Sequence, residues 1–131
     1  MNATELKQYR VLVVDDNLDT ANTLTYLLRD SGHIVHCALI GSLALDLAKA
    51  QRPEVVLLDI GLPDYDGIKL ARDIKKTPGL ENVHIVALTG RNCDDEQRAL
   101  DAGCDLFIPK PVDPRTLEKI IGQVMETVPR H

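Results

Sequence analysis

The chain contains, near its middle, the stretch Val55-Val56-Leu57-Leu58-Asp59. Four aliphatic residues in a row are typical of a strand that is buried on both faces, as in a parallel sheet covered by helices. The turn-rich segment 60–67 follows directly, so Asp59 is predicted to stand at the carboxyl end of a central strand. Ligands bind at that end of open α/β sheets. A single Asp at a strand end can also be a turn former or a helix cap, and Asp59 alone does not separate these roles.

Four further aliphatic stretches are predicted to be strands, and helix signals follow every strand. With the first stretch, the predicted strands are residues 11–14, 34–38, 55–59, 83–88 and 104–108. The predicted helices run between capping or breaking residues: Asn17 to Ser31, Ser42 to Arg52, Asp66 to Lys76, Asp94 to Ala102, and from Asp113 onward. This alternation predicts an α/β fold, a doubly wound five-stranded parallel sheet of order 2-1-3-4-5 flanked by five helices.

The composition limits the function classes. The 131 residues are expected to form one domain, and 44% of them are hydrophobic, which is enough for a core. Fifteen Lys and Arg residues against twenty Asp and Glu residues give a formal charge of −5, which argues against a nucleic-acid-binding domain. No apolar run approaches the roughly 20 residues of a membrane span, and no signal peptide opens the chain. The cysteines Cys37, Cys93 and Cys104 lack metal-ligand spacing, so reduced thiols and a cytoplasmic location are expected.

The predicted topology brings three carboxylates together. The switch point of the sheet lies between the first and third strands, so Asp15 and Asp16 should lie beside Asp59. Like charges this close repel each other unless protons or a cation compensate, and oxygen ligands favour a hard divalent cation such as Mg²⁺. Lys110 follows the fifth strand, where its ammonium could reach Asp59 or remain solvated. Thr89 follows the fourth strand, as a functional hydroxyl or as a plain helix cap.

The residues at the ends of the predicted strands match those of a known protein family. We find a resemblance to the receiver domain of two-component response regulators, a CheY-like domain of flavodoxin-like fold, in Asp15-Asp16, Asp59, Thr89, Phe107 and Lys110-Pro111. The resemblance covers about residues 10–128 and implies a single receiver domain over residues 1–131 without an output domain. Segments 87–90 and 110–114 are similar to the receivers attached to hybrid sensor kinases.

The resemblance implies a phosphorylation site. Asp59 would accept a phosphoryl group from a kinase phosphohistidine in the presence of Mg²⁺ (or Mn²⁺). Asp16 would bind the metal directly, Asp15 mainly through water, Asp59 through one oxygen, and Gly61 through its backbone carbonyl. Lys110, in a cis peptide bond with the proline that follows it, would pair with Asp59 and then with a phosphoryl oxygen. Such a protein is not an enzyme in the ordinary sense, since it catalyses only its own phosphorylation and dephosphorylation.

The resemblance also implies a conformational output. The Thr89 hydroxyl would donate to the phosphoryl group, and Phe107 would then turn from exposed to buried. The family commonly has Tyr at the position of Phe107, so a hydroxyl hydrogen bond is missing here. A histidine kinase or phosphotransfer domain would dock on the first helix near Leu18, Ala21 and Asn22. A downstream protein would bind the fourth helix, fifth strand and fifth helix, with no direct contact to nucleic acid or membrane.

Other functions remain as alternatives. A phosphorylation-independent docking receiver would lack site residues, and none is missing; a phosphate-shuttling module of a hybrid kinase stays open. A haloacid-dehalogenase-like phosphatase needs a second Asp two residues after its nucleophile, which Asp15-Asp16-Asn17 does not supply. A flavin-binding module needs a phosphate loop where this chain carries two carboxylates. Arg91 and Gly61 flank the expected route of water to the phosphate, and the phosphoryl lifetime is left unpredicted.

Overall fold

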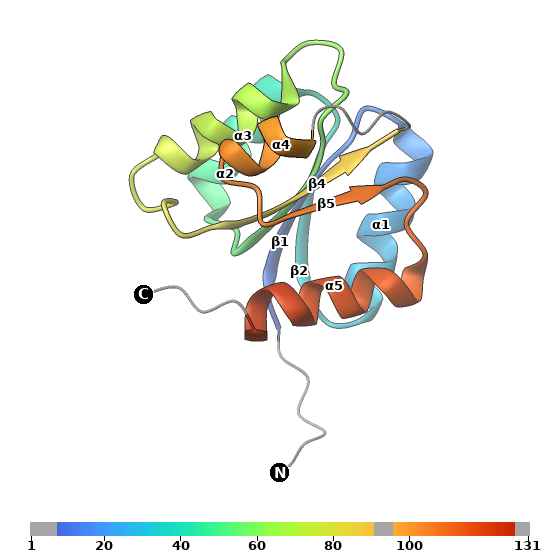
Figure 1. Ribbon diagram of the computed structural model, residues 1–131. Helices are drawn as coiled ribbons and strands as arrows, with labels where there is room; N and C mark the ends of the chain where they lie inside the picture. Colours follow the sequence, from blue (N-terminus) through green and yellow to red (C-terminus); the bar gives the residue numbers. More distant parts are fainter. Residues whose placement is uncertain (1–7, 91–95, 128–131) are drawn as a thin grey trace.

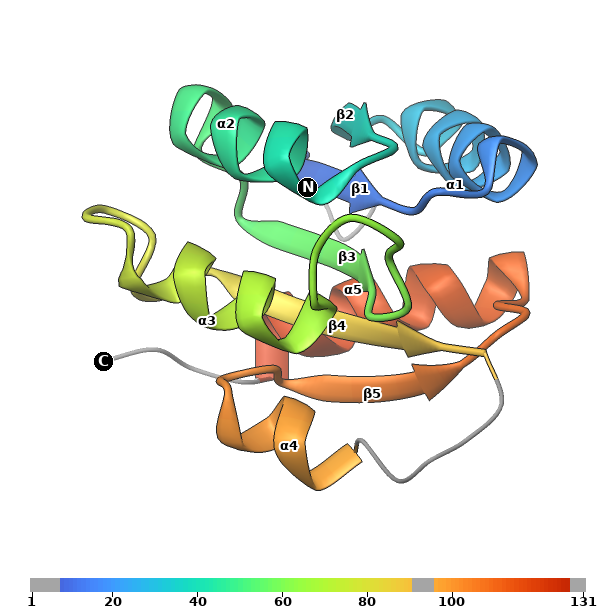
Figure 2. The same ribbon diagram turned by 90° about the horizontal axis from the view of Figure 1, so that it is seen from above.

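The computed structural model describes residues 8–90 and 96–127 (Figure 1). In chain order the elements are β1 (Arg10–Val14), α1 (Leu18–Asp30), β2 (Ile34–Ala38), α2 (Gly41–Gln51), β3 (Val55–Asp59), α3 (Gly67–Lys76), β4 (His84–Thr89), α4 (Glu96–Asp101), β5 (Leu106–Pro109) and α5 (Pro114–Thr127). The strands form one sheet of order β2-β1-β3-β4-β5, and every neighbouring pair is parallel (Figure 2). The predicted doubly wound α/β fold of flavodoxin-like topology is therefore confirmed.

Successive residues of the central strands enter two different cores. In β3, Val56 and Leu58 join the core under α2, α3 and α4, whereas Val55 and Leu57 join the core under α1 and α5. Figure 1 shows these two groups of helices on opposite faces of the sheet. Because neither face of β3 meets solvent, an unbroken aliphatic run is stable there, and all five of its residues are buried.

Three helices begin at capping side chains that the sequence predicts, the third being α5, where Asp113 Oδ1 accepts the Arg115 N–H at 3.4 Å. Asn17 accepts a hydrogen bond of 3.0 Å from the Thr20 N–H at the start of α1, and Asp66 accepts one of 2.9 Å from the Ile68 N–H at the start of α3. The predicted start of the fourth helix at Asp94 lies outside the described residues. Within the described part of the chain, no helix combines the length and the apolar character needed to cross a membrane.

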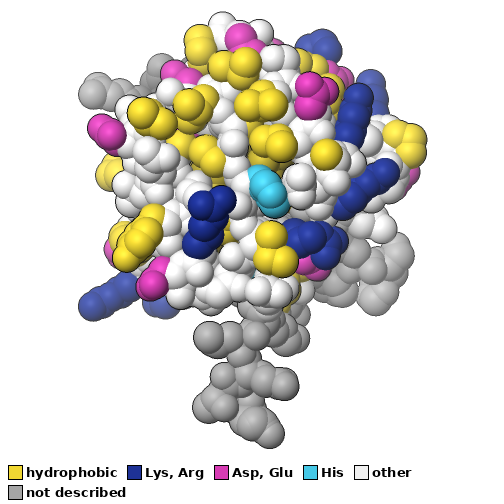
Figure 3. Space-filling view, turned by 180° about the vertical axis from the view of Figure 1, so that it is seen from behind, with side chains coloured by type: hydrophobic (Ala, Val, Ile, Leu, Met, Phe, Trp, Pro, Cys, Tyr) yellow, Lys and Arg dark blue, Asp and Glu magenta, His cyan; other side chains and the backbone are white. Residues whose placement is uncertain are grey.

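The apolar residues of the predicted second helix, Leu43, Ala44, Leu47 and Ala48, are expected to form its buried face, and this expectation is partly wrong. The sequence suggests that Leu43 enters the core, yet its side chain is 43% exposed. Small residues of α2, Ala44 and Ala48, face the sheet instead and let the helix approach closely. Leu39 and Ile40, which precede the helix, are exposed as well. Hydrophobic side chains also gather on the upper part of the face that Figure 3 shows.

Arginine side chains join the loops at the amino end of the sheet. The Arg10 N–H donates to Glu54 Oε1 at 3.0 Å, and its Nε donates to the Arg52 carbonyl at 2.8 Å. Arg52 in turn donates from Nη1 to the Pro78 carbonyl at 2.7 Å. These bonds connect the start of β1, the end of α2 and the segment after α3.

Two histidines are also fixed at this end of the sheet. His84 Nδ1 lies 3.2 Å from Asp105 Oδ2, which accepts a second hydrogen bond of 3.1 Å from the Ile85 N–H. His33 stacks on Tyr9 with ring centroids 5.5 Å apart, and its Nδ1 accepts the Tyr9 N–H at 3.1 Å. Both histidines therefore have structural partners, and neither is part of a metal-binding group in the described residues.

Candidate functional site

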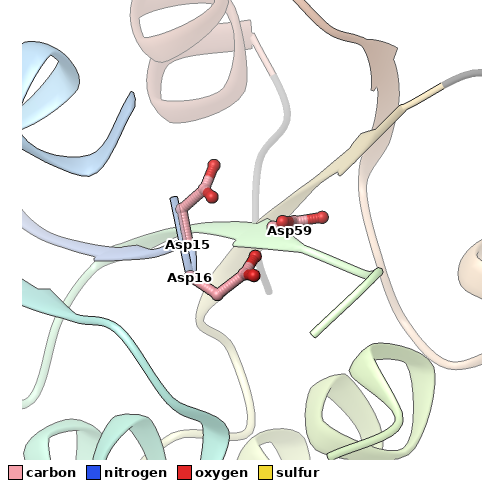
Figure 4. Close-up of side chains that lie close together, drawn as sticks. All are labelled: Asp15, Asp16 and Asp59. Carbon is pink, nitrogen blue, oxygen red and sulfur yellow. The ribbon is translucent and has the colours of Figure 1, made fainter. Parts of the chain in front are cut away.

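Three carboxylates meet at the carboxyl end of the sheet. Asp59 ends β3, and Asp15 and Asp16 follow β1, the strand beside it. One oxygen from each side chain lies within 4.8 Å of the others (Figure 4). Asp15 is fully buried and Asp59 nearly so, whereas Asp16 is exposed to solvent. The convergence expected from the strand order is present because β1 and β3 pair in parallel and end at the same edge.

Lys110 bridges two of these carboxylates. Its Nζ lies 2.9 Å from Asp15 Oδ2 and 3.5 Å from Asp59 Oδ2. The backbone of Lys110 is fixed to the end of β4 by a 2.7 Å hydrogen bond from its N–H to the Thr89 carbonyl. The Lys110-Pro111 peptide bond is cis, as the resemblance implies. The ammonium thus contacts Asp59 as expected, but Asp15 is the nearer partner, which the sequence does not predict.

The surroundings of Asp59 shift its protonation. Burial is the main cause that raises the pKa of Asp59, and the hydrogen bond from the Gly61 N–H and the charge of Lys110 oppose it. The negative charge of Asp15 and a side-chain hydrogen bond with Asp16 add smaller increases. Burial lowers the pKa of Lys110, but the contacts with Asp15 and Asp59 outweigh this effect and raise it. The Lys110 ammonium thus contacts two of the three carboxylates, so these four side chains contain more acidic groups than basic ones.

The donor set fits a hard divalent cation. All the side-chain donors of the cluster are carboxylate oxygens, one of them on the exposed Asp16, so a hydrated cation can approach from solvent. Mg²⁺ prefers oxygen ligands and keeps several of its waters, which this open arrangement permits. A cation would also oppose the burial and the repulsion by Asp15 that raise the pKa of Asp59.

The remaining predicted residues lie on neighbouring elements. Gly61, two residues after Asp59, donates its N–H to Asp59 Oδ1 at 2.9 Å. Thr89 is buried at the end of β4, one residue after Leu88, which pairs with Asp59 in the sheet. Phe107 lies in β5, half-buried against the core under α2, α3 and α4, and is not part of the acidic cluster. Arg91 lies outside the described residues.

The expected kinase-docking residues do not share one exposed face. Leu18 and Asn22 are exposed on α1, but Ala21 is fully buried, so it cannot contact a partner directly. Helix periodicity explains the difference, because Ala21 and Leu24 lie on the stripe that packs on the sheet.

Two features near the site are not predicted by the sequence. A pocket of about 390 Å³ lies beside Lys110, and its lining comes from α1, β4 and the segment after β5: Asp19, Thr20, Thr23, Leu24, Leu88, Lys110, Pro111 and Val112. Asp64, in the loop after Asp59, accepts hydrogen bonds from the first two N–H groups of α2. The sequence contains no signal for the second feature, since an Asp in a turn-rich segment is usually a local turn former.

Comparison with known proteins agrees with this geometry. The family described as "Response regulator receiver domain" matches residues 11–122. An uncharacterized 14.6 kDa protein of Leptolyngbya boryana is 35% identical over 119 residues, which are 90% of this chain and 91% of that protein. The chemotaxis protein CheY4 of Vibrio cholerae has a TM-score of 0.85 and 26% identity, over 90% of this chain and 99% of that chain.

A third relative contains a metal ion at the corresponding kind of site. The receiver domain of the sensor histidine kinase PA1611 from Pseudomonas aeruginosa PAO1 has a magnesium ion coordinated in its active-site cleft. It has a TM-score of 0.82 and 28% identity, over 91% of this chain and 98% of that chain. Since the family matches residues 11–122, most of the chain, the chain belongs to the response regulator receiver domain family, the receiver domains of phosphorelay signalling proteins.

Proposed function

We propose that this chain is a phosphorylation-activated switch in a two-component phosphorelay, with Asp59 as the phosphoryl acceptor. The observation that carries the proposal is the position of Asp59, which ends the central strand between two further carboxylates and the Lys110 ammonium. In the transfer, an Asp59 oxygen forms a bond to phosphorus while the bond from phosphorus to the histidine nitrogen of the donor breaks. The electron pair of that bond stays on the imidazole of the donor.

Four residues would hold the divalent cation. The exposed Asp16 would bind Mg²⁺ directly and the buried Asp15 mainly through water, with one oxygen of Asp59 and the backbone carbonyl of Gly61 completing the protein ligands. When bound, Mg²⁺ or Mn²⁺ neutralises charge on the phosphoryl group that is being transferred. Asp59 must be ionised to attack, so the cation and Lys110 also keep its carboxylate deprotonated against the effect of burial.

Lys110 would have a second role after the phosphoryl group has been transferred to Asp59. Its Nζ lies between Asp15 and Asp59, so a phosphoryl oxygen on Asp59 becomes a new acceptor within reach of the ammonium. The phosphoryl group adds between about 1.5 and 2 negative charges and three strong acceptor oxygens. Lys110 would move its hydrogen bond from the carboxylate to this group.

The output would run through β4 and β5. Thr89 ends β4, and its hydroxyl would donate to a phosphoryl oxygen and move toward Asp59. Phe107 pairs with Ala87 of β4 and is half-buried, so a displaced Thr89 would leave room for further burial of its ring. Because Phe has no hydroxyl, this switch would rest on packing alone. A histidine kinase or phosphotransfer domain would supply the phosphoryl group, and a downstream protein would bind α4, β5 and α5.

A phosphate donor of low molecular mass tests the proposal. Acetyl phosphate with Mg²⁺ is expected to add the mass of one phosphoryl group to the intact protein, and the Asp59→Asn variant is expected to add none. Labelling that persists in Asp59→Asn would move the acceptor to another residue. A wild-type protein that binds Mg²⁺ but is never labelled, by acetyl phosphate or by a phosphohistidine donor, would favour the phosphorylation-independent docking receiver.

A further inference from the structure

The loop between β3 and α3, residues 60–66, is closed at its base. A Cβ atom on Gly67 would overlap the backbone of Ile60, so this close approach of the two loop ends requires glycine. Near the start of the loop, the Gly61 N–H is bonded to Asp59 Oδ1, and the Leu62 side chain is buried in the core. The first half of the loop is thus attached to Asp59 and to the hydrophobic core.

Asp64 attaches the second half of the loop to α2. The Gly41 N–H donates to Asp64 Oδ1 at 2.8 Å, and the Ser42 N–H donates to Asp64 Oδ2 at 3.3 Å. Ile40, the residue at the N-cap position of α2, has no side chain that could accept these bonds. The Asp64 carboxylate therefore caps a helix that begins 23 residues earlier in the sequence, where the helix dipole favours its negative charge.

Tyr65 strengthens the same attachment. A Cβ atom on Gly41 would overlap the Tyr65 side chain, so the glycine makes room for the ring against the start of α2. The Tyr65 hydroxyl donates to Asp73 of α3, and Lys69 Nζ bonds the same carboxylate at 2.9 Å. The loop is consequently bound to α2 on one side and to α3 on the other.

We propose that Asp64 is a positioning residue, which anchors residues 60–66 to α2 and thereby holds Gly61 and Asp59 in the arrangement that binds the divalent cation. This inference rests on the proposed function, in which both residues are metal ligands. Only Leu62 and Pro63 separate Gly61 from Asp64, and the φ angle of Pro63 is fixed by its ring. An anchored Asp64 therefore restricts Gly61, and a ligand that is already ordered loses less entropy when the metal binds.

The test compares Asp64→Ala with Asp64→Asn. Both variants remove one negative charge near the acidic cluster, but the Asn carbonyl can still accept the Gly41 N–H. Asp46→Asn, which removes an exposed carboxylate from α2, is the matched control for charge. Two quantities are measured by NMR on the full chain: the hydrogen exchange rate of the Gly61 amide without metal, and the Kd for Mg²⁺ by titration.

We expect Asp64→Ala to increase the Gly61 exchange rate and to raise the Kd for Mg²⁺ about fivefold, because the binding-competent loop is then populated only part of the time. Asp64→Asn and Asp46→Asn should remain within about twofold of the wild type. If Asp64→Ala does not fold, Gly41→Ala tests the attachment of the loop to α2 from the other side, because its Cβ would displace Tyr65, the neighbour of Asp64.

Two results would overturn the inference. One is an Asp64→Ala protein with a lower urea midpoint but unchanged Gly61 exchange, which would make Asp64 a helix cap only. The other is an equal loss of Mg²⁺ affinity in Asp64→Asn and Asp64→Ala, which would make the effect one of charge. A wild-type protein without Mg²⁺ affinity would instead overturn the proposed function, and the exchange of the Gly61 amide would still decide whether Asp64 orders the loop.

Discussion

Charged side chains are arranged differently at the amino end and at the carboxyl end of the sheet. At the amino end, Arg10 lies 3.8 Å from Glu54, and Asp105 accepts a backbone N–H beside the ring of His84. At the carboxyl end, three carboxylates lie close together, and the Lys110 ammonium contacts two of them, Asp15 and Asp59. The first arrangement pairs each charge with a partner, whereas the second leaves an excess of negative charge.

This difference separates the part of the molecule that holds the fold from the part that binds ligands. Under the proposed function, this site must keep charge uncompensated before the cation and the phosphoryl group bind, and this costs stability. The amino end and the two cores must supply that stability. Substitutions at the two ends should therefore differ in the sign of their effect on stability, or in whether they affect stability alone or phosphoryl labelling as well.

The largest effect is expected for Asp59→Asn, which should abolish phosphoryl labelling by acetyl phosphate. The same substitution should raise the urea midpoint of the metal-free protein, because it removes a buried like charge from the cluster. Intact mass and urea denaturation measure the two quantities, with Asp30→Asn, an exposed acid at the end of α1, as control. An Asp59→Asn protein that is less stable than the wild type would contradict the view that this end of the sheet is under charge repulsion.

Lys110→Met should destabilise the metal-free protein by about 3 kcal/mol, since it leaves the buried Asp15 carboxylate without its cationic partner. Saturating Mg²⁺ should restore part of the loss, because a bound cation supplies positive charge to the same carboxylates. Urea denaturation with and without Mg²⁺ measures both changes. A loss below about 1 kcal/mol would mean that solvent already screens Asp15.

Asp105→Ala should destabilise the protein by about 2 kcal/mol, because the Ile85 N–H and the His84 ring lose an acceptor at a mostly buried position. Its labelling rate with acetyl phosphate should equal that of the wild type under conditions where both are folded. If labelling slowed in proportion to the loss of stability, the two ends of the sheet would be coupled rather than separate.

The smallest effect concerns pH. The pKa of Asp59 is raised above its ordinary value of 3.8, chiefly by burial, so the folded state binds this proton more tightly than the unfolded state. The contribution of Asp59 to stability is therefore most favourable at low pH and is lost as the pH rises from that ordinary value through the raised pKa. Urea midpoints of the metal-free wild type should fall relative to those of Asp59→Asn across this range. Parallel curves would show that Asp59 titrates normally.

Most of the fold follows from local patterns in the sequence. The alternation of strands and helices predicts the strand order. The first and third aliphatic runs both end in carboxylates, so the parallel pairing of these two strands brings Asp15, Asp16 and Asp59 together. Lys110 Nζ lies 2.9 Å from Asp15 Oδ2 and 3.5 Å from Asp59 Oδ2. No sequence pattern predicts so small a difference between two possible partners.

The features that the sequence does not predict depend on contacts between segments that are distant in the chain. Periodicity places Leu43 on the buried face of α2, yet Leu43 is exposed, because the rotation of this helix is set by how closely its small residues approach the sheet. The bond from Gly41 to Asp64 joins residues 23 positions apart, and it forms only after β3 has placed the loop beside α2. Such contacts require the folded chain.

The first strand of the chain lies in the interior of the sheet, between β2 and β3. During synthesis, β1 can pair with β2 as soon as residue 38 has emerged, but its other edge has no partner until residues 55–58 have been made. An aliphatic strand with one open edge attracts strands of other chains. The arrival of β3 closes this edge of β1 but leaves the outer edge of β3 itself without a partner until residues 84–88 of β4 have been made. The nascent chain therefore exposes an aliphatic strand edge until its fourth strand is available.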